Sequence, residues 1–172
     1  TQFAPYLLAG VLLINLGSPD TTETKDVKRY LGEFLMDERV IDIAYWKRFL
    51  LIKGIILQVR PKKSGTAYKK IWWDEGSPLI VLSKRLQAKI QKQVSVPVEL
   101  AMRYGNPSIK SALNNLRKQN CDKIIIFPLY PQYCAATTGS TFDAVAKEFL
   151  NWRWVPSLRF ISNYHTNDQY IT

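Results

Sequence analysis

Four short, continuous apolar runs, separated by longer segments with helical periodicity, constrain the fold of this chain more than any other feature. The runs cover residues 11–16, 98–102, 123–129 and 158–162, and each is brief and rich in branched side chains. Continuous apolarity is typical of strands that are covered on both faces. Strands that alternate with helices are joined by right-handed crossovers into a parallel sheet. We therefore predict a three-layer α/β domain with a parallel sheet of about four strands.

The segments between these runs carry the signals that begin helices. Thr24 is expected to cap the first helix, and Ser77 followed by Pro78 to start the second. Asn106 is expected to cap the third helix, with Pro107 in its first turn. The predicted buried faces are formed by Val27, Tyr30, Leu31, Phe34 and Leu35 in the first helix, Leu79, Leu82, Leu86 and Ile90 in the second, Ile109, Ala112, Leu113 and Leu116 in the third, and Phe142, Val145, Ala146 and Phe149 in a fourth helix over residues 140–150.

The predicted topology selects a candidate binding region. In parallel α/β sheets, ligands lie beyond the carboxyl ends of the strands. That rule points to the loops over residues 17–22, 103–106 and 130–139. Because the chain shows no internal repeat, low-complexity tract or linker, we predict that residues 1–172 form a single domain.

The charge of the chain suggests an anionic partner. The net charge is +10, and much of the excess lies over residues 47–70, where lysines and arginines alternate with large apolar side chains. A segment that is both basic and apolar suits an amphiphilic ligand or a membrane edge better than a nucleic acid. The alternative is an amphipathic helix whose basic face is simply solvated.

Nothing in the sequence indicates a membrane span or a secretion signal. The longest uncharged apolar run, residues 3–15, is too short to cross a bilayer and is interrupted by Pro5. The layout of a signal peptide is missing. We expect a cytoplasmic protein whose two cysteines, Cys121 and Cys134, are reduced, because their spacing matches no zinc or redox motif.

Two of the strand-end loops carry side chains suited to binding. Arg103 lies at a strand end beside a helix start, where it could hold a carboxylate or phosphate, or instead pair with a structural carboxylate. Residues 130–141 are dense in hydroxyls and aromatic rings, which favours a binding surface, although Thr138 or Ser140 could serve as a helix cap. The loop after the first run has one glycine and a proline, so it does not form a G-x-G-x-x-G pyrophosphate cradle.

Five segments of the chain resemble, in the same order, the N-terminal blocks of the ferrochelatase family, which inserts ferrous iron into a porphyrin to form haem. They are residues 10–20 (GVLLINLGSPD), 27–39 (VKRYLGEFLMDER), 76–79 (GSPL), 102–107 (MRYGNP) and 127–140 (FPLYPQYCAATTGS). The resemblance spans nearly the whole chain and is strongest to the enzymes of Gram-negative bacteria. It implies that the chain is the N-terminal half of such an enzyme, one of two Rossmann-like (chelatase-like) halves that flank a porphyrin cleft.

The same resemblance implies which residues contact the porphyrin. Leu16 would face the metal centre of the macrocycle and pack on the ring. Segment 34–60, which we call the lip, would border the cleft mouth, where a flat apolar ligand with two propionates needs apolar and cationic contacts. The lip would also suit contact with a membrane surface. The polar positions implied by the resemblance are Arg60, Tyr68, Ser77, Arg103, Tyr104, Tyr130, Thr137 and Thr138.

Some of these positions have simpler interpretations. Arg60 suits a propionate, yet it could be a solvated loop charge. Tyr68 and Ser77 could be an ordinary core residue and an ordinary helix cap.

The chain lacks the chemistry that metalation needs. Two pyrrole protons must leave as iron enters, and histidine is the natural acceptor near neutral pH. The single histidine, His165, is expected to be an exposed loop residue. Asp20 is interpreted as a turn residue, and Asp37 and Glu38 as helix-end charges rather than metal ligands. The resemblance places the catalytic histidine and glutamate beyond Thr172, so we expect no catalytic or metal-binding residue in this chain.

The expected partners are protoporphyrin IX and ferrous iron, both as substrates, with no bound cofactor in this half. The sequence leaves open whether an iron–sulfur cluster belongs to the protein. It also leaves two alternatives: a related chelatase for coproporphyrin or another metal, and a basic, non-catalytic module that binds phosphate ligands or nucleic acid.

Overall fold

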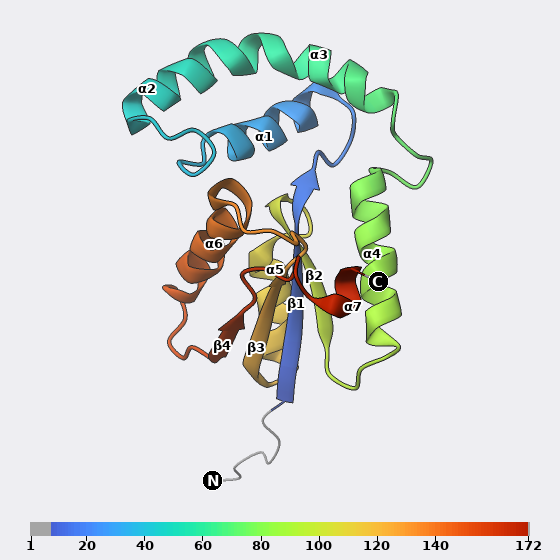
Figure 1. The fold of residues 1–172 in the computed structure, drawn as a ribbon. Coiled ribbons are helices and arrows are strands. Elements are labelled where there is room, and N and C mark those ends of the chain that lie inside the picture. The colour runs from blue at the N-terminus through green and yellow to red at the C-terminus, as the bar shows by residue number, and fades with distance from the viewer. Residues whose placement is uncertain (1–7, 172) are drawn as a thin grey trace.

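The structure is a computed structural model that describes residues 8–171 (Figure 1). The first part of the uncharged apolar run of residues 3–15, which was judged too short to cross a bilayer, lies outside the described residues. The strands form one parallel sheet in the order β2-β1-β3-β4, which confirms the predicted α/β class and strand number. The elements are β1 (Leu8–Ser18), α1 (Thr24–Leu35), α2 (Tyr45–Phe49), the π-helical η1 (Leu50–Ile56), α3 (Leu57–Lys69), α4 (Pro78–Gln91), β2 (Val98–Gly105), α5 (Ile109–Lys118), β3 (Cys121–Pro128), the π-helical η2 (Ala135–Gly139), α6 (Ser140–Phe149), β4 (Ser157–Phe160) and α7 (Asp168–Ile171).

Helices cover both faces of the sheet, as the continuous apolar runs predict. Successive side chains of a strand point to opposite faces. Leu12 and Ile14 of β1 pack in a core with α5 and α6, whereas Leu13 packs in a second core that includes residues of β2 and α4. The edge strand β4 is different, because three of its four residues are exposed and Leu158 is 44% exposed. The expectation of cover on both faces therefore holds for β1 but not for β4.

A further group of helices lies across the carboxyl ends of the strands. In Figure 1, α1 lies beneath a long curved helix formed by α2, η1 and α3, and this pair extends over the top of the sheet. Val27, Leu31, Ile52 and Leu57 form the core between them, and it continues to Tyr104 at the end of β2. The lip is thus held against the edge of the sheet where ligands of parallel α/β proteins bind.

The expected start of the third helix is wrong. The Asn106–Pro107 peptide bond is cis, and both residues form a turn before α5 rather than its first residues. Ser108 is the actual N-cap, because its hydroxyl accepts a hydrogen bond of 3.1 Å from the Ser111 N–H. The Asn106 amide instead donates to the carboxylate of Asp20.

Two expected helix faces also differ from the structure. In α4, Leu82 and Leu86 are exposed, whereas Val81 and Ser83 are buried. The Ser83 hydroxyl accepts a hydrogen bond of 3.0 Å from the Asn15 amide of β1, so the side of α4 that carries Ser83 faces the sheet. In α6, Val145 and Phe149 are buried as expected, but Phe142 and Ala146 are exposed. Phe142 packs edge-on against Phe160 of the edge strand.

Both cysteines are free thiols, as expected, with Cys121 buried and Cys134 exposed. Within residues 8–171, no helix is both long enough and apolar enough to cross a bilayer.

Candidate functional site

A cavity at the carboxyl end of β1 brings together three of the residues implied by the resemblance. This β1-end cavity has a volume of about 320 Å³ and is lined by Leu16, Tyr68 and Ser77. They come from β1, from the last turn of α3 and from the residue that precedes α4. Leu16 and Tyr68 are half-buried and Ser77 is buried, so their side chains form a shaped wall rather than an open surface.

Two aromatic residues of this cavity were not selected from the sequence as site residues. Tyr30 was expected only as a core residue of the first helix, yet it lines the cavity and donates a hydrogen bond of 3.3 Å to the Gly17 carbonyl. Trp72 also lines the cavity and packs edge-on against Tyr68. The three aromatic residues close together in the sequence, Tyr68, Trp72 and Trp73, were the signal that could have identified Trp72.

None of the described residues that line the β1-end cavity is charged, and its tyrosines stay protonated. Burial raises the pKa of Tyr30, and neighbouring Tyr68 raises it further. Burial also raises the pKa of Tyr68, although the nearby charge of Arg60 opposes this shift. A largely apolar wall with a few neutral hydroxyls suits an apolar ligand that needs hydrogen bonds at a few points.

Arg60 lies outside the β1-end cavity. It is exposed on α3, in a shallow groove with Ile55, Val59 and Lys63 whose volume is about 710 Å³. Within residues 8–171 its guanidinium has no ion-pair partner. The role of Arg60 toward a propionate therefore stays a prediction.

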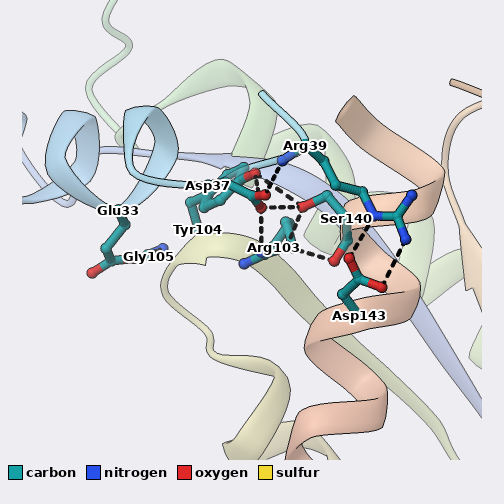
Figure 2. Close-up of polar contacts among 8 residues, drawn as sticks. All are labelled: Glu33, Asp37, Arg39, Arg103, Tyr104, Gly105, Ser140 and Asp143. Carbon is teal, nitrogen blue, oxygen red and sulfur yellow. Dashed lines mark hydrogen bonds and ion pairs between the residues drawn. The ribbon is translucent and has the colours of Figure 1, made fainter. Parts of the chain in front are cut away.

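Arg103 and Tyr104 are not on the cavity wall but in a polar network at the end of β2 (Figure 2). The Asp37 carboxylate is the centre of this network: one of its oxygens accepts hydrogen bonds from the Arg103 guanidinium, from the Tyr104 hydroxyl at 2.8 Å and from the Ser140 hydroxyl at 2.5 Å. Its other oxygen accepts the Arg39 N–H at 2.8 Å. The side chain of Asp37 is only 7% exposed and that of Arg103 17%.

This network corrects the interpretation of Asp37 as a helix-end charge. Asp37 follows α1 in sequence, but its carboxylate joins the start of the lip to β2 and to the first residue of α6. Arg103 has the structural partner that was its alternative interpretation, and Ser140 binds Asp37 instead of capping α6. The Asp37 network thus adds a polar connection between the start of the lip, β2 and α6 to the apolar core that packs the lip.

The network lowers the pKa of Asp37. Burial is the largest single effect and by itself would raise this pKa, but the hydrogen bonds from Ser140, from the Arg39 N–H and from Tyr104, together with the charge of Arg103, outweigh it. The pKa of Asp37 therefore lies below its ordinary value of 3.8.

This direction predicts how the stability of the fold depends on pH. Since the carboxyl of Asp37 is more acidic in the folded than in the unfolded state, its contribution is present above the unfolded-state pKa. It is lost as the pH falls through the folded-state pKa. We expect the free energy of unfolding, measured by urea titration at decreasing pH, to fall less steeply in Asp37→Asn than in the unsubstituted chain. Asp42→Asn, at an exposed position, is the matched control. Equal slopes for the unsubstituted chain and Asp37→Asn would contradict the prediction.

The loop after β3 contributes a separate polar region. The hydroxyl of Tyr130 is buried beside Thr141 but outside hydrogen-bonding geometry with it, and the hydroxyls of Thr138 and Thr141 also lack partners among the described residues. Burial raises the pKa of Tyr130. Thr137 is half-buried and donates to the Cys134 carbonyl at 3.4 Å. Buried hydroxyls without partners commonly contact a ligand or an ordered water.

The strand-end residues that were selected from the sequence therefore lie at the same edge of the sheet but do not line the same cavity. Leu16 lines the β1-end cavity, Arg103 lies in the Asp37 network, and Tyr130 lines a different cavity of about 520 Å³ together with Cys134 and His165. His165 is exposed in a loop, as expected. No group of three His, Cys, Asp or Glu residues in the described part of the chain is arranged to hold a metal ion.

The lip exposes an extended apolar surface on α2, η1 and α3. Lys47, Lys53 and Arg60 add exposed positive charge to it. Arg48, however, is buried, and its guanidinium donates to the carbonyls of Ile41 and Ile43, so it closes the preceding loop instead of facing a ligand. The exposed apolar side chains are Tyr45, Trp46, Phe49, Leu50, Leu51, Ile55 and Val59.

The parallel sheet, with flanking helices and a cavity at its carboxyl edge, defines the class of this protein as α/β. Comparison with known proteins identifies the family. The family model described as Ferrochelatase matches residues 9–172, and the chain belongs to the ferrochelatase family.

Curated relatives agree with this assignment. The chain is 51% identical over 167 residues to Ferrochelatase 2 of Shewanella oneidensis, in an alignment that covers 94% of this chain and 51% of that protein. It is 47% identical over 174 residues to the ferrochelatase of Thioalkalivibrio sulfidiphilus, with coverage of 98% and 47%. It is 49% identical over 170 residues to that of Alcanivorax borkumensis, with coverage of 94% and 49%. The chain spans about half the length of the curated relatives it matches.

Proposed function

We propose that this chain forms one wall of the porphyrin site of a ferrochelatase, which inserts ferrous iron into protoporphyrin IX to form haem. The observation that carries the proposal is the β1-end cavity. It groups Leu16, Tyr68 and Ser77, which the family resemblance implies as porphyrin contacts, at the sheet edge where α/β proteins bind ligands.

The size of the β1-end cavity supports binding of part of a macrocycle. At about 320 Å³ it lies at the lower end of the range of ligand pockets, roughly 300–1,000 Å³. It therefore suits one edge of a flat ring, with the remaining surface covered by a second wall. Leu16 would pack on the ring, and the protonated Tyr68 and the Ser77 hydroxyl would donate hydrogen bonds to polar substituents.

In this proposal the two halves of the enzyme have different roles, and the role of this half follows from the residues that it contains. Its residues grip the macrocycle and help to distort it, whereas proton transfer and iron delivery belong to the histidine and glutamate that the family resemblance places in the other half. Tyr30 and Tyr68 are poor proton acceptors, because their raised pKa values keep both hydroxyls protonated at neutral pH. Ferrous iron is a substrate in this proposal, and this half holds no cofactor.

Because none of the described residues that line the β1-end cavity is a proton acceptor near neutral pH, we expect the 172 residues alone to show no iron insertion above the uncatalysed rate. The measurement is the loss of protoporphyrin fluorescence with ferrous iron under anaerobic conditions. Turnover above that rate would show that His165 or a carboxylate of this chain accepts the pyrrole protons.

The lip would be the entrance for the porphyrin in this proposal, and it would touch the membrane surface from which an apolar ligand arrives. Its exposed apolar side chains and its lysines support both roles. Arg60, which is exposed in the groove on α3, would hold a propionate of the porphyrin in this proposal.

Protoporphyrin binding tests the proposed function directly. Titration with protoporphyrin IX is expected to quench tryptophan fluorescence, and Trp72→Phe should remove more of the quenching than Trp154→Phe, since Trp72 lines the β1-end cavity. Leu16→Asp should weaken binding about tenfold, because a charge would face the apolar ring. Leu150→Asp, at a position that is 85% exposed, is the matched control.

Two further binding measurements distinguish the proposed function from the nucleic-acid module and from the related chelatase. Porphyrin affinity should change little with salt, whereas a nucleic-acid module would lose affinity steeply as salt rises. Tighter binding of coproporphyrin than protoporphyrin would favour the related chelatase. If Leu16→Asp melts normally and binds porphyrin with unchanged affinity, the β1-end cavity is not the porphyrin site.

A further inference from the structure

Tyr30 carries a phenolic hydroxyl into a core position where a phenylalanine would fill nearly the same space. The residue is 6% exposed and packs with Val27 and Leu57 in the core between α1 and α3. Its ring stacks on that of Phe34, with the ring centroids 6.3 Å apart and an interplanar angle of 10°. A buried hydroxyl destabilises the fold unless it has a hydrogen-bond partner, so its partner indicates what the hydroxyl does.

The partner of the Tyr30 hydroxyl is the backbone at the carboxyl end of β1. The hydroxyl donates a hydrogen bond of 3.3 Å to the carbonyl of Gly17, the residue that follows Leu16. The pairing of β1 with β3 ends at Ile14, whereas its pairing with β2 continues to Ser18. The strand end that carries Leu16 is therefore held by β2, and the Tyr30 hydroxyl adds a contact from α1.

The backbone at Gly17 is closely packed against β2. A Cβ atom at this position would lie 1.9 Å from the Tyr104 carbonyl oxygen, and the φ angle of Gly17 is +110°. Only glycine adopts this conformation without strain. Because the Gly17 carbonyl is only a few bonds from Leu16, a hydrogen bond that fixes the carbonyl also restricts the backbone that carries the Leu16 side chain.

The Tyr30 hydroxyl also lies beside the hydroxyl of Tyr68, in the last turn of α3. Tyr68 packs against the core that contains Tyr30, and both residues line the β1-end cavity together with Leu16. Tyr30 thus contacts, from α1, the strand end and the lip residue that meet at this cavity.

We propose that Tyr30 is a positioning residue of the porphyrin site, whose hydroxyl holds the Gly17 carbonyl and thereby sets the direction in which Leu16 meets the ring. This inference rests on the proposed function, because the direction of Leu16 matters only if the β1-end cavity holds the porphyrin. A distance of 3.3 Å is long for a hydrogen bond between two oxygens, so the expected effect on affinity is modest.

Titration of the chain with protoporphyrin IX, followed by tryptophan fluorescence, tests this role. Tyr30→Phe should weaken binding about threefold, as for loss of one weak neutral hydrogen bond. Tyr164→Phe, which removes the hydroxyl of a half-buried tyrosine outside the β1-end cavity, is the matched control and should leave the affinity unchanged.

A double substitution shows whether Tyr30 acts through Leu16. When Tyr30→Phe is added to Leu16→Ala, it should change the porphyrin affinity less than it does in the unsubstituted chain, because the side chain that Tyr30 positions is then missing. Melting curves check that each variant is folded at the temperature of the titration. In the absence of ligand, the amide NMR signals of Gly17 and Ser18 should shift in Tyr30→Phe but not in Tyr164→Phe.

Three results would overturn the proposal, and they separate it from the proposed function. If Tyr30→Phe binds protoporphyrin as tightly as the unsubstituted chain, Tyr30 has no positioning role, although the site itself stands. If Tyr30→Phe weakens binding equally with and without the Leu16 side chain, Tyr30 supports the fold in general and not Leu16. If the unsubstituted chain does not bind protoporphyrin, the proposed function fails and the role of Tyr30 fails with it.

Discussion

Ile52→Asp is expected to destabilise the fold by about 4 kcal/mol or more, whereas Ile55→Asp should change the free energy of unfolding by no more than about 0.5 kcal/mol. Both residues belong to η1, but Ile52 is fully buried and Ile55 is 61% exposed. Ile52 lies in the core with Val27, Leu31 and Leu57, so an aspartate there leaves a cavity and buries a carboxylate. Urea unfolding of the two variants measures the difference directly.

The same pair of variants tests the lip. Because Ile55→Asp leaves the core intact, it changes only the apolar surface that the porphyrin is proposed to cross. In a full-length enzyme that contains this half, it should raise KM for porphyrin several-fold and leave KM for iron unchanged. An unchanged porphyrin KM in a normally melting Ile55→Asp would mean that the exposed surface of η1 has no part in substrate entry. Equal stabilities of the two variants would contradict the assignment of Ile52 to the core.

Arg103→Met is expected to cost about 3 kcal/mol of stability, since it leaves the Asp37 carboxylate buried without its cation. Arg85→Met is the matched control, because it breaks another arginine–carboxylate pair, with Glu75, whose side chains are 56% and 59% exposed. An exposed pair contributes about 0–1 kcal/mol, so the control should melt close to the unsubstituted chain.

A double substitution separates the charge from the packing of Arg103. Combining Arg103→Met with Asp37→Asn removes the unpaired charge, so the combined loss of stability should be smaller than the sum of the two single losses. Additive losses would show that Arg103 stabilises the fold through its methylene groups and not through Asp37. Thermal melts of the four chains complete the cycle.

The sheet was predictable because its signal is local. The apolar run at residues 11–16 reports burial on both faces of β1, and the structure places Leu12 and Leu13 in two different cores. The carboxyl-edge rule then selected the loop over residues 17–22, which begins next to Leu16, without knowledge of the family. Family resemblance selected Leu16, Tyr68 and Ser77 themselves, and the structure brings all three to one cavity.

The Asp37 network was not predictable, because its partners are far apart in sequence. Asp37 is separated from Arg103 by 66 residues and from Ser140 by 103, and no periodicity marks such a contact. One weak signal was present: a carboxylate just beyond a helix C-terminus is disfavoured by the helix dipole. The position of Asp37 after α1 is therefore a sign that another interaction offsets the unfavourable effect of the helix dipole. The cis bond before Pro107 likewise had no signal that distinguishes it from a helix start.

The predicted buried face of α4 was right for Leu79 and Ile90, which pack against the core, but wrong for Leu82 and Leu86, which are exposed. An apolar helix such as α4 offers more than one stripe at helical spacing, and the stripe through Leu82 and Leu86 is as regular as the one that is buried. The hydrogen bond between Asn15 and Ser83 shows which side faces β1, and this polar pair lies outside any hydrophobic pattern.

The π-helical geometry of η1 sets the angular phase of everything that follows it in the lip. Each residue of an α-helix advances the chain by about 100° around the axis, whereas the i→i+5 hydrogen bonds of a π-helix fit more residues into each turn. The hydrogen-bond pattern of η1 therefore sets the direction in which Tyr68, on the last turn of α3, points toward the β1-end cavity. The length of η1 is thus under a constraint that its own exposed side chains do not reveal.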